Sequence, residues 1–363
     1  MADVLLKELS NSDLDWMSTV GQRETIAPGT VLVKPCQDTE SIYVLLDGTL
    51  SVTIPQKANT TDSGSSISTH VSEQEIVQLS RGEIVGETFL FNFCSMPALI
   101  KATGKSIVLS IPRQQLMSKL QQDIIFAAHF YRAIALILTE RLRQILALSE
   151  QTEFRGTQPI KEALFIFAEL RDSDIDWLIQ TGQVEKVPPG KILAQAGRPI
   201  DALYLVLDGV LLASIPEEDY NPLTACFKCS QDSDKPLDEI EVERLSRGAT
   251  GGIISFLDSR PFPMTLRALQ ETLVLSIPRQ QLAAKLQQDL GFASRFYRIM
   301  AIQLSTYLQS AMVLLGCDQQ TYQQDQAMDE DIEYGDELCL TSLTQVSQAA
   351  VRFNWMLKRL GVV

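Results

Sequence analysis

The chain has 363 residues, 45% of them hydrophobic, which is enough for two cores of ordinary size and one further segment. Its formal net charge at pH 7 is −14, so its overall field repels nucleic-acid phosphates and anionic lipids. The largest basic cluster that we find is Lys358-Arg359, near the C-terminus. We therefore expect no nucleic-acid partner.

The N-terminal residues differ from a targeting signal, because they are acidic and lack the apolar stretch that a signal peptide needs. The longest apolar run, from Ile124 to Leu138, is interrupted by His129 and Arg132 and is too short to cross a bilayer. We expect a cytoplasmic protein with no direct membrane insertion. The six cysteines have no matched spacing, which argues against a disulfide framework.

One sequence pattern occurs twice in the chain. The first copy of the pattern consists of Trp16, Pro28-Gly29, 43–48, 54–55, 79–82 and 110–116. The second copy has its counterparts, in the same order, at Trp177, Pro189-Gly190, 204–209, 215–216, 245–248 and 276–282. A repeat this long indicates a duplicated domain, since solenoid units run to about 20–50 residues. We expect one domain at 1–150, a linker at 151–161 and a second domain at 162–315.

Each copy is predicted to begin with a short helix, at Ser12–Met17 and at Ser173–Leu178. In the first copy, Ile42–Leu46 and Thr49–Ile54 flank Asp47-Gly48, and Asp-Gly is a strong hairpin signal. We therefore predict a β-hairpin there.

Further strands are expected at 75–79 and 106–111, and many short strands between Gly and Pro turns are typical of a jelly roll. From Pro112 to about Leu148 the spacing of apolar residues becomes helical, which predicts one or two helices, and the second copy repeats this to about Leu315. The expected fold class is mainly β with α, in the form of two tandem jelly-roll domains with flanking helices.

This order of helix, jelly roll and helices resembles a cyclic nucleotide-binding domain. Residues 43–48, YVLLDG, are similar to the Y-x-(V/L)-x-x-G hairpin of that family, and 79–87, LSRGEIVGE, are similar to its L-x-x-G-x-x-x-G-E segment. The resemblance covers roughly 5–150 and 162–315. It implies in each copy a pocket where an Arg pairs with the cyclic phosphate and a Glu accepts a hydrogen bond from the ribose.

Both copies depart from that pattern. The pocket positions are Gly86, Glu87 and Met96 in the first copy and Gly252, Ile253 and Phe262 in the second. Met96 and Phe262 stand at the Arg position, so both copies lack the phosphate-pairing cation; Arg260 is the alternative cation, although Pro261 directs it elsewhere. We expect degenerate pockets filled by apolar side chains, and no cofactor. The open alternative is a small-molecule sensor that uses the first pocket.

Catalytic and metal-binding groups are sparse. Cys226 and Cys229 form a C-x-x-C that supplies two of the four ligands of a structural zinc site, so they are either free thiols or half of a site shared between chains. His129 is aligned with Ser294 of the second copy, which predicts a packing or capping position. Because we find no nucleophile constellation, we expect no enzyme.

The long helices of the two copies share the sequence Phe-Tyr-Arg and carry apolar residues on more than one face. The residues expected to form a contact are Phe130, Tyr131, Ile134 and Leu138 in the first copy and Phe296 and Tyr297 in the second. These helices either pair within one chain as a pseudo-dimer, pair across a homodimer, or cover their own jelly rolls.

The chain ends in a segment outside the duplication. Residues 316–337 are acidic and Gln-rich, which predicts a flexible tether, and 338–363 form an amphipathic pattern. Its expected partner-binding residues are Leu343, Val346, Phe353, Trp355, Met356 and Leu360. This helix either docks on a partner protein or folds back onto the second domain.

The double domain, the repeated Phe-Tyr-Arg helix and the ending RFNWMLKRL at 352–360 resemble the cyanobacterial family of bacteriocin-type transport-associated proteins. The resemblance implies a non-catalytic adaptor or regulatory subunit. Its protein partner would then be a component of a peptide exporter or secretion system.

Overall fold

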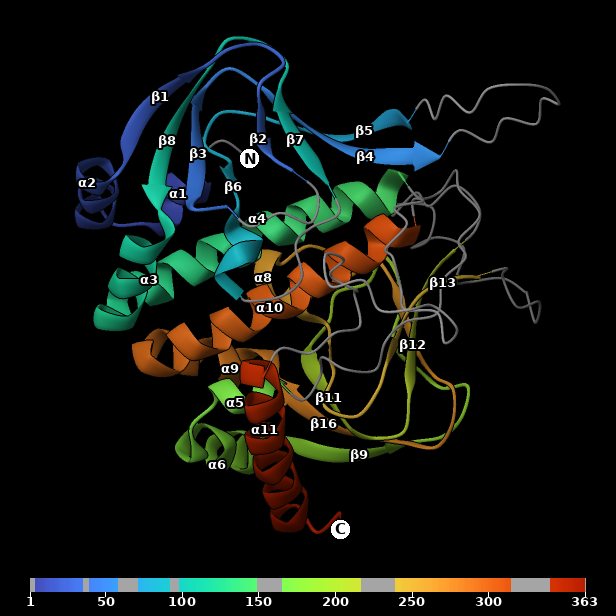
Figure 1. Ribbon diagram of the computed structural model, residues 1–363. Coiled ribbons are helices and arrows are strands. Elements are labelled where there is room, and N and C mark those ends of the chain that lie inside the picture. Colours follow the sequence, from blue (N-terminus) through green and yellow to red (C-terminus); the bar gives the residue numbers. More distant parts are fainter. Residues whose placement is uncertain are drawn as a thin grey trace, which may run out of the picture. The chain divides into compact units, whose positions relative to one another are not determined.

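Two units of the same architecture make up the chain (Figure 1). The computed structural model describes residues 4–34, 39–57, 71–91, 98–148, 165–216, 239–314 and 340–362. The first unit contains the described residues up to Leu148 and 311–314, and the second contains residues 165–310 together with the C-terminal helix. The expected fold of two tandem domains, each with antiparallel sheets and flanking helices, is confirmed.

The first domain begins with helices α1 (Val4–Glu8) and α2 (Asn11–Val20). One sheet has the order β1-β8-β3-β6, made of Gln22–Ile26, Ser106–Pro112, Ser41–Asp47 and Ile84–Val85. The other has the order β2-β7-β4-β5, made of Val31–Val33, Leu99–Ala102, Leu50–Lys57 and Val71–Leu79. The 3-10 helix η1 (Glu87–Phe91) follows β6, and helices α3 (Arg113–Gln122) and α4 (Ile124–Leu148) follow β8.

The second domain repeats this plan after α5 (Phe165–Glu169) and α6 (Asp172–Thr181). Its sheets have the orders β14-β11-β16-β9, made of Thr250–Gly251, Ala202–Asp208, Thr272–Pro278 and Gln183–Val187, and β10-β15-β12-β13, made of Ile192–Ala194, Thr265–Ala268, Leu211–Pro216 and Glu239–Leu245. Its other helices are α8 (Ile253–Asp258), α9 (Arg279–Gln288), α10 (Leu290–Leu314) and α11 (Leu340–Arg359).

The predicted Asp47-Gly48 hairpin is wrong. Strands β3 and β4 lie in different sheets, and β4 pairs instead with β5 and β7. A two-residue type I′ hairpin needs positive φ at both central residues, but only Gly48, at φ 91°, has it. A Cβ at Gly48 would lie 2.5 Å from the Ser106 hydroxyl oxygen, so the glycine allows a tight corner where the chain crosses between the sheets.

The predicted short helices near the start of each domain are confirmed. Ser10 caps α2, because its hydroxyl accepts from the Asp13 N–H at 3.3 Å while the Asp13 carboxylate accepts from the Ser10 N–H at 2.8 Å. In the second domain Arg171 occupies the cap position, and its N–H donates to Asp174 at 2.8 Å.

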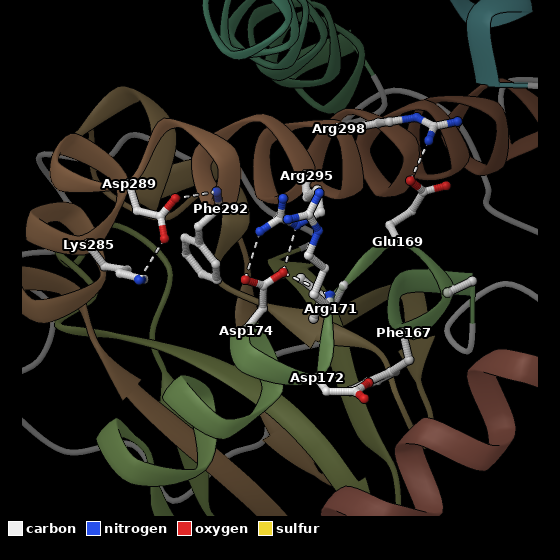
Figure 2. Close-up of polar contacts among 12 residues, drawn as sticks. Phe167, Glu169, Arg171, Asp172, Asp174, Lys285, Asp289, Phe292, Arg295 and Arg298 are labelled. Carbon is white, nitrogen blue, oxygen red and sulfur yellow. Dashed lines mark hydrogen bonds and ion pairs between the residues drawn. The ribbon is translucent and has the colours of Figure 1, made fainter. Parts of the chain in front are cut away.

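The helical part after each jelly roll consists of two helices, separated at Asp123 and at Asp289. Each aspartate accepts a backbone N–H from the first turn of the longer helix, from Phe126 at 3.0 Å and from Phe292 at 2.9 Å. Each also pairs at 2.8 Å with the lysine four residues earlier (Figure 2, second domain). The lysine and backbone hydrogen bonds hold the pKa of both carboxyl groups below its ordinary value.

Candidate functional site

The first pocket position is built around a buried carboxylate. Strand β6 ends at Val85, and the φ of 87° at Gly86 turns the chain into η1. Glu87 begins that helix with only 2% of its surface exposed. The guanidinium of Arg141, which comes from α4 and is also buried, donates to the Glu87 carboxylate and to the Ile84 carbonyl oxygen. Glu87 therefore has a cationic partner from its own domain.

A small cavity lies beside this ion pair. It measures about 20 Å³, with room for one water molecule, and its lining includes Val52, Ile100 and Arg141. The Nε of Arg141 is buried there without a hydrogen-bond partner among the described residues. Met96 lies outside the described residues, so its predicted place in the pocket stays a prediction.

The second pocket position is apolar. Strand β14 ends at Gly251, Gly252 follows with a φ of 96°, and α8 begins at Ile253. Ile253 is 2% exposed and Phe262 is 1% exposed, so apolar side chains are buried at the positions where the family pattern has Glu and Arg. Arg260 does not turn inward, since its side chain is 48% exposed and pairs with Asp258 at 2.9 Å.

The long helices make the same contact in both domains. Arg141 and Tyr307 are equivalent positions, and each donates to the carbonyl two residues before the pocket glycine, Ile84 in the first domain and Thr250 in the second. The Tyr307 hydroxyl lies 3.0 Å from the Thr250 oxygen. Arg141 occurs with Glu87, while Tyr307 occurs with Ile253, so charge is present at both positions or at neither.

Sequence reasoning missed Arg141 and Tyr307. Arg141 and Glu87 are 54 residues apart, and neither contact belongs to a local motif. The duplication held the one available signal, which is that two aligned differences, Arg to Tyr and Glu to Ile, change charge together.

The family comparison agrees with this architecture. The model of the cyclic nucleotide-binding domain matches residues 23–123 and 184–289, together more than half of the chain. The chain belongs to the cyclic nucleotide-binding domain family. Among curated proteins, none matches it.

Solved structures similar to these tandem cyclic nucleotide-binding domains include a regulatory domain of protein kinase A from Toxoplasma gondii with cAMP, at 14% identity and a TM-score of 0.28, covering 81% of this chain and 90% of that one. The catabolite activator protein of Thermus thermophilus shares 17% identity at a TM-score of 0.32, covering 51% and 75%.

Several predicted contact residues of the long helices lie among aromatic side chains of their own cyclic nucleotide-binding domain. Phe130 stacks on Phe126 with ring centroids 5.6 Å apart, and Phe296 stacks on Phe292 at 5.3 Å. Ile134 and Leu138 are buried, as is Tyr131, while Tyr297 is partly exposed. A two-fold contact through these helices stays a prediction.

His129 is equivalent to Arg295, one residue after the Ser294 that we expected. Its Nδ1 lies 2.9 Å from the Asp13 carboxylate, while Arg295 pairs with Asp174 at 2.7 Å (Figure 2). Burial raises the pKa of Asp13, but hydrogen bonds from His129 and Ser10 lower it further, so the pKa lies below its ordinary value. These pairs tie the short helices to α4 and α10.

The C-terminal helix α11 lies against α5 and α6 of the second domain (Figure 1). Phe353 is 1% exposed, and its ring meets the Phe167 ring edge to face with centroids 4.7 Å apart. The Arg247 guanidinium lies 5.2 Å from the centre of the Phe353 ring. Phe353 is thus held between an aromatic ring and a cation.

Charged groups on α11 complete this seat. The Arg352 Nη1 donates to the carbonyl oxygens of Phe167, Ala168 and Leu170, at 3.3, 2.9 and 2.7 Å, where the last turn of α5 leaves acceptors without helical partners. Arg359 pairs with Asp176 at 3.3 Å.

Of the two alternatives for the C-terminal helix, the structure shows the one in which it folds back. Phe353 and Met356 are buried on the second domain, while Trp355 lies under Arg359 at 5.3 Å and Leu360 is partly exposed. The side chains of Leu343 and Val346 lie outside the description. The apolar stripe is covered because Phe353 packs on the Phe167 ring, and Arg352 holds the helix in place through the carbonyl oxygens at the end of α5.

Other predictions concern residues that the structure leaves undescribed. All six cysteines, including Cys226 and Cys229, lie outside the described ranges, as does the acidic segment 316–337. In the described part of the chain, no three His, Cys, Asp or Glu side chains are grouped as metal ligands. Within the same ranges, none of the helices is long and apolar enough to span a membrane.

Proposed function

We propose that this chain is a non-catalytic regulatory adaptor of the cytoplasm, which binds a protein partner and does not take cyclic AMP or cyclic GMP in the manner of its family. The second pocket carries this proposal, because Ile253 and Phe262 are buried where Glu and Arg are expected. A cyclic phosphate there would lack a charge-assisted hydrogen bond of about 1.5–3 kcal/mol and would lose its water as well.

The first pocket supports the same conclusion. One oxygen of the Glu87 carboxylate already accepts from the buried Arg141 guanidinium, and the cavity beside this pair measures about 20 Å³, room for one water molecule and none for a nucleotide. A cyclic nucleotide would enter only if the side chains around this buried ion pair moved apart.

Calorimetry of the full chain with cyclic AMP and cyclic GMP tests the proposal. We expect no heat of binding at micromolar ligand. Micromolar affinity that disappears in Glu87→Ala, and persists in the exposed control Glu24→Ala, would overturn it.

The finer part of the proposal is that the partner belongs to a peptide-export system. The RFNWMLKRL ending at 352–360 and its family resemblance support it. We expect the purified chain to bind the cytoplasmic domains of a purified peptide exporter, as measured by interferometry. No binding would remove this part and leave the adaptor role in place.

A second candidate function is a sensor for a small ligand in the first domain. The Nε of Arg141 favours it, because this buried donor has no hydrogen-bond partner among the described residues, and a buried N–H without a partner is costly. The adjacent cavity holds one water molecule, so a ligand would have to widen it. A calorimetric panel of cyclic mononucleotides and dinucleotides separates the two functions. Saturable binding that Arg141→Met abolishes would favour the sensor.

A further inference from the structure

The seat that α11 occupies on the second domain has a counterpart on the first. The paired positions are Phe167 and Leu6, Ala168 and Lys7, Leu170 and Leu9, Asp176 and Asp15, and Arg247 and Arg81. The aromatic anchor is thus replaced by another large apolar residue, and the aspartate and the arginine are both retained. Helices α1 and α2 and the turn after β5 carry these residues in the same order as in the second domain.

The scaffold under the two faces is the same. Glu8 pairs with Arg132 at 3.0 Å, and the equivalent Glu169 pairs with Arg298 (Figure 2). The aspartate that caps the second short helix also bonds to the long helix in each domain, through His129 in the first and Arg295 in the second. The backbone that presents Leu6 is therefore fixed in the same way as the backbone that presents Phe167.

The first-domain face is exposed where the second-domain face is covered. Phe167 is fully buried under α11, while Leu6 is 63% exposed, a high fraction for a large apolar side chain. Asp15 and Arg81 are exposed too, and the structure records no hydrogen bond or ion pair of either side chain with another described residue. We name the surface formed by Leu6, Asp15 and Arg81 the α1 face.

We propose that the α1 face binds an amphipathic helix of a partner protein, and that this helix has the chemistry of α11. It would carry an arginine directly before an aromatic residue, and a second arginine seven residues after the first, as Arg352, Phe353 and Arg359 do. A spacing of seven places both arginines on one side of a helix, two turns apart. The proposal rests on the proposed function as an adaptor and specifies its partner.

Charge and shape complementarity define this occupant. Asp15 faces the position of the second arginine, as Asp176 faces Arg359 at 3.3 Å. Arg81 can lie over the aromatic ring, as Arg247 lies over Phe353 at 5.2 Å. An acidic helix would meet the aspartate with like charge, so a basic and aromatic helix is the one that fits.

The α11 of a second copy fits this face less well than it fits its own domain. Leu6 has no ring to meet Phe353 edge to face, which is worth roughly two- to tenfold in affinity. Asn11 also replaces Asp172, which lies 3.6 Å from Arg352. Helix α11 therefore keeps its own seat, and the α1 face is left for another helix.

A synthetic peptide of residues 340–362, labelled with fluorescein, is the probe for this face. Titration with the full chain, followed by anisotropy, is expected to show saturable binding of one peptide per chain. Leu6→Glu removes the apolar contact and Asp15→Arg reverses the charge that meets the arginine, so each should weaken binding at least tenfold. Both side chains are exposed, so neither change should prevent folding. Val31→Glu, an equally apolar-to-acidic change at an exposed position of β2, is the matched control and should change nothing.

A charge exchange makes the test specific. The peptide with Arg359→Asp should bind the Asp15→Arg chain more tightly than it binds the parent chain. Melting temperatures will check that both variants fold. If Leu6→Glu does not fold, the test rests on Asp15→Arg.

Each contrary result refutes the proposal. No saturable binding would remove it, and so would binding that neither variant weakens, because the peptide would then have displaced α11 from the second domain. Dimers of the parent chain that Leu6→Glu dissociates in sedimentation would make the occupant a second copy. None of these outcomes touches the proposed function, which fails only if the calorimetry detects cyclic nucleotide in the pockets.

Discussion

The Arg141–Glu87 pair predicts how the first domain responds to substitution. Both side chains are buried, at 5% and 2% exposure, so removing one partner leaves a charge without compensation. Arg141→Tyr or Glu87→Ile alone should each lower the free energy of unfolding by roughly 3–5 kcal/mol. The double variant reproduces the pair that the second domain uses, Tyr307 with Ile253, and we expect it to lie within about 1 kcal/mol of the parent.

Urea unfolding of the full chain, followed by circular dichroism, measures this cycle. Two domains call for a fit with separate transitions, and only the transition of the first should move. Tyr307→Phe is the control in the second domain, and the loss of its neutral hydrogen bond should cost about 0.5–1.5 kcal/mol there. A coupling energy below about 1 kcal/mol between Arg141 and Glu87 would refute the argument that the two residues act as a pair.

Three further predictions concern the helices. Phe353→Ala should release α11 from its seat, because the ring is worth about 3–5 kcal/mol when buried, and limited proteolysis should then remove the C-terminus. Stability should be constant above about pH 5 and fall as the pH drops through the lowered pKa of Asp123 and Asp289, since both carboxylates are bound as anions in the folded chain. Ile134→Glu with Leu138→Glu should change the sedimentation coefficient or the melting temperature, because both side chains are buried.

Matched variants control these measurements. Val351→Ala changes a side chain of α11 that is 68% exposed and should leave the proteolysis pattern as it is. Asp123→Asn with Asp289→Asn should reduce the loss of stability at acid pH. An unchanged loss would mean that other carboxylates cause it. Unchanged sedimentation and melting in the α4 double variant would show that Ile134 and Leu138 carry no contact.

The duplication made the fold predictable from the sequence. Features that depend on contacts between distant residues could not be predicted. Turn residues and strand periodicity are local signals, so the strands and the short helices followed from them. Strand pairing is not local, which is why Asp47-Gly48 was read as a hairpin although it is a corner between sheets. The pocket residues Ile253 and Phe262 were found by alignment, whereas Arg141 comes from a helix 54 residues away and had no motif to reveal it.

The seat of α11 also bears on the order in which the chain folds during synthesis. Domains generally fold as units from the N-terminus onward as the chain leaves the ribosome. Apart from residues 311–314 at the end of α10, the described strands and helices of the first unit are all made by Leu148, so it can form while translation continues. The second cannot cover Phe167 until α11, which carries Phe353, has left the exit tunnel. Phe167 therefore stays uncovered while the chain between it and α11 is made, and a stop codon placed before α11 would leave that ring exposed.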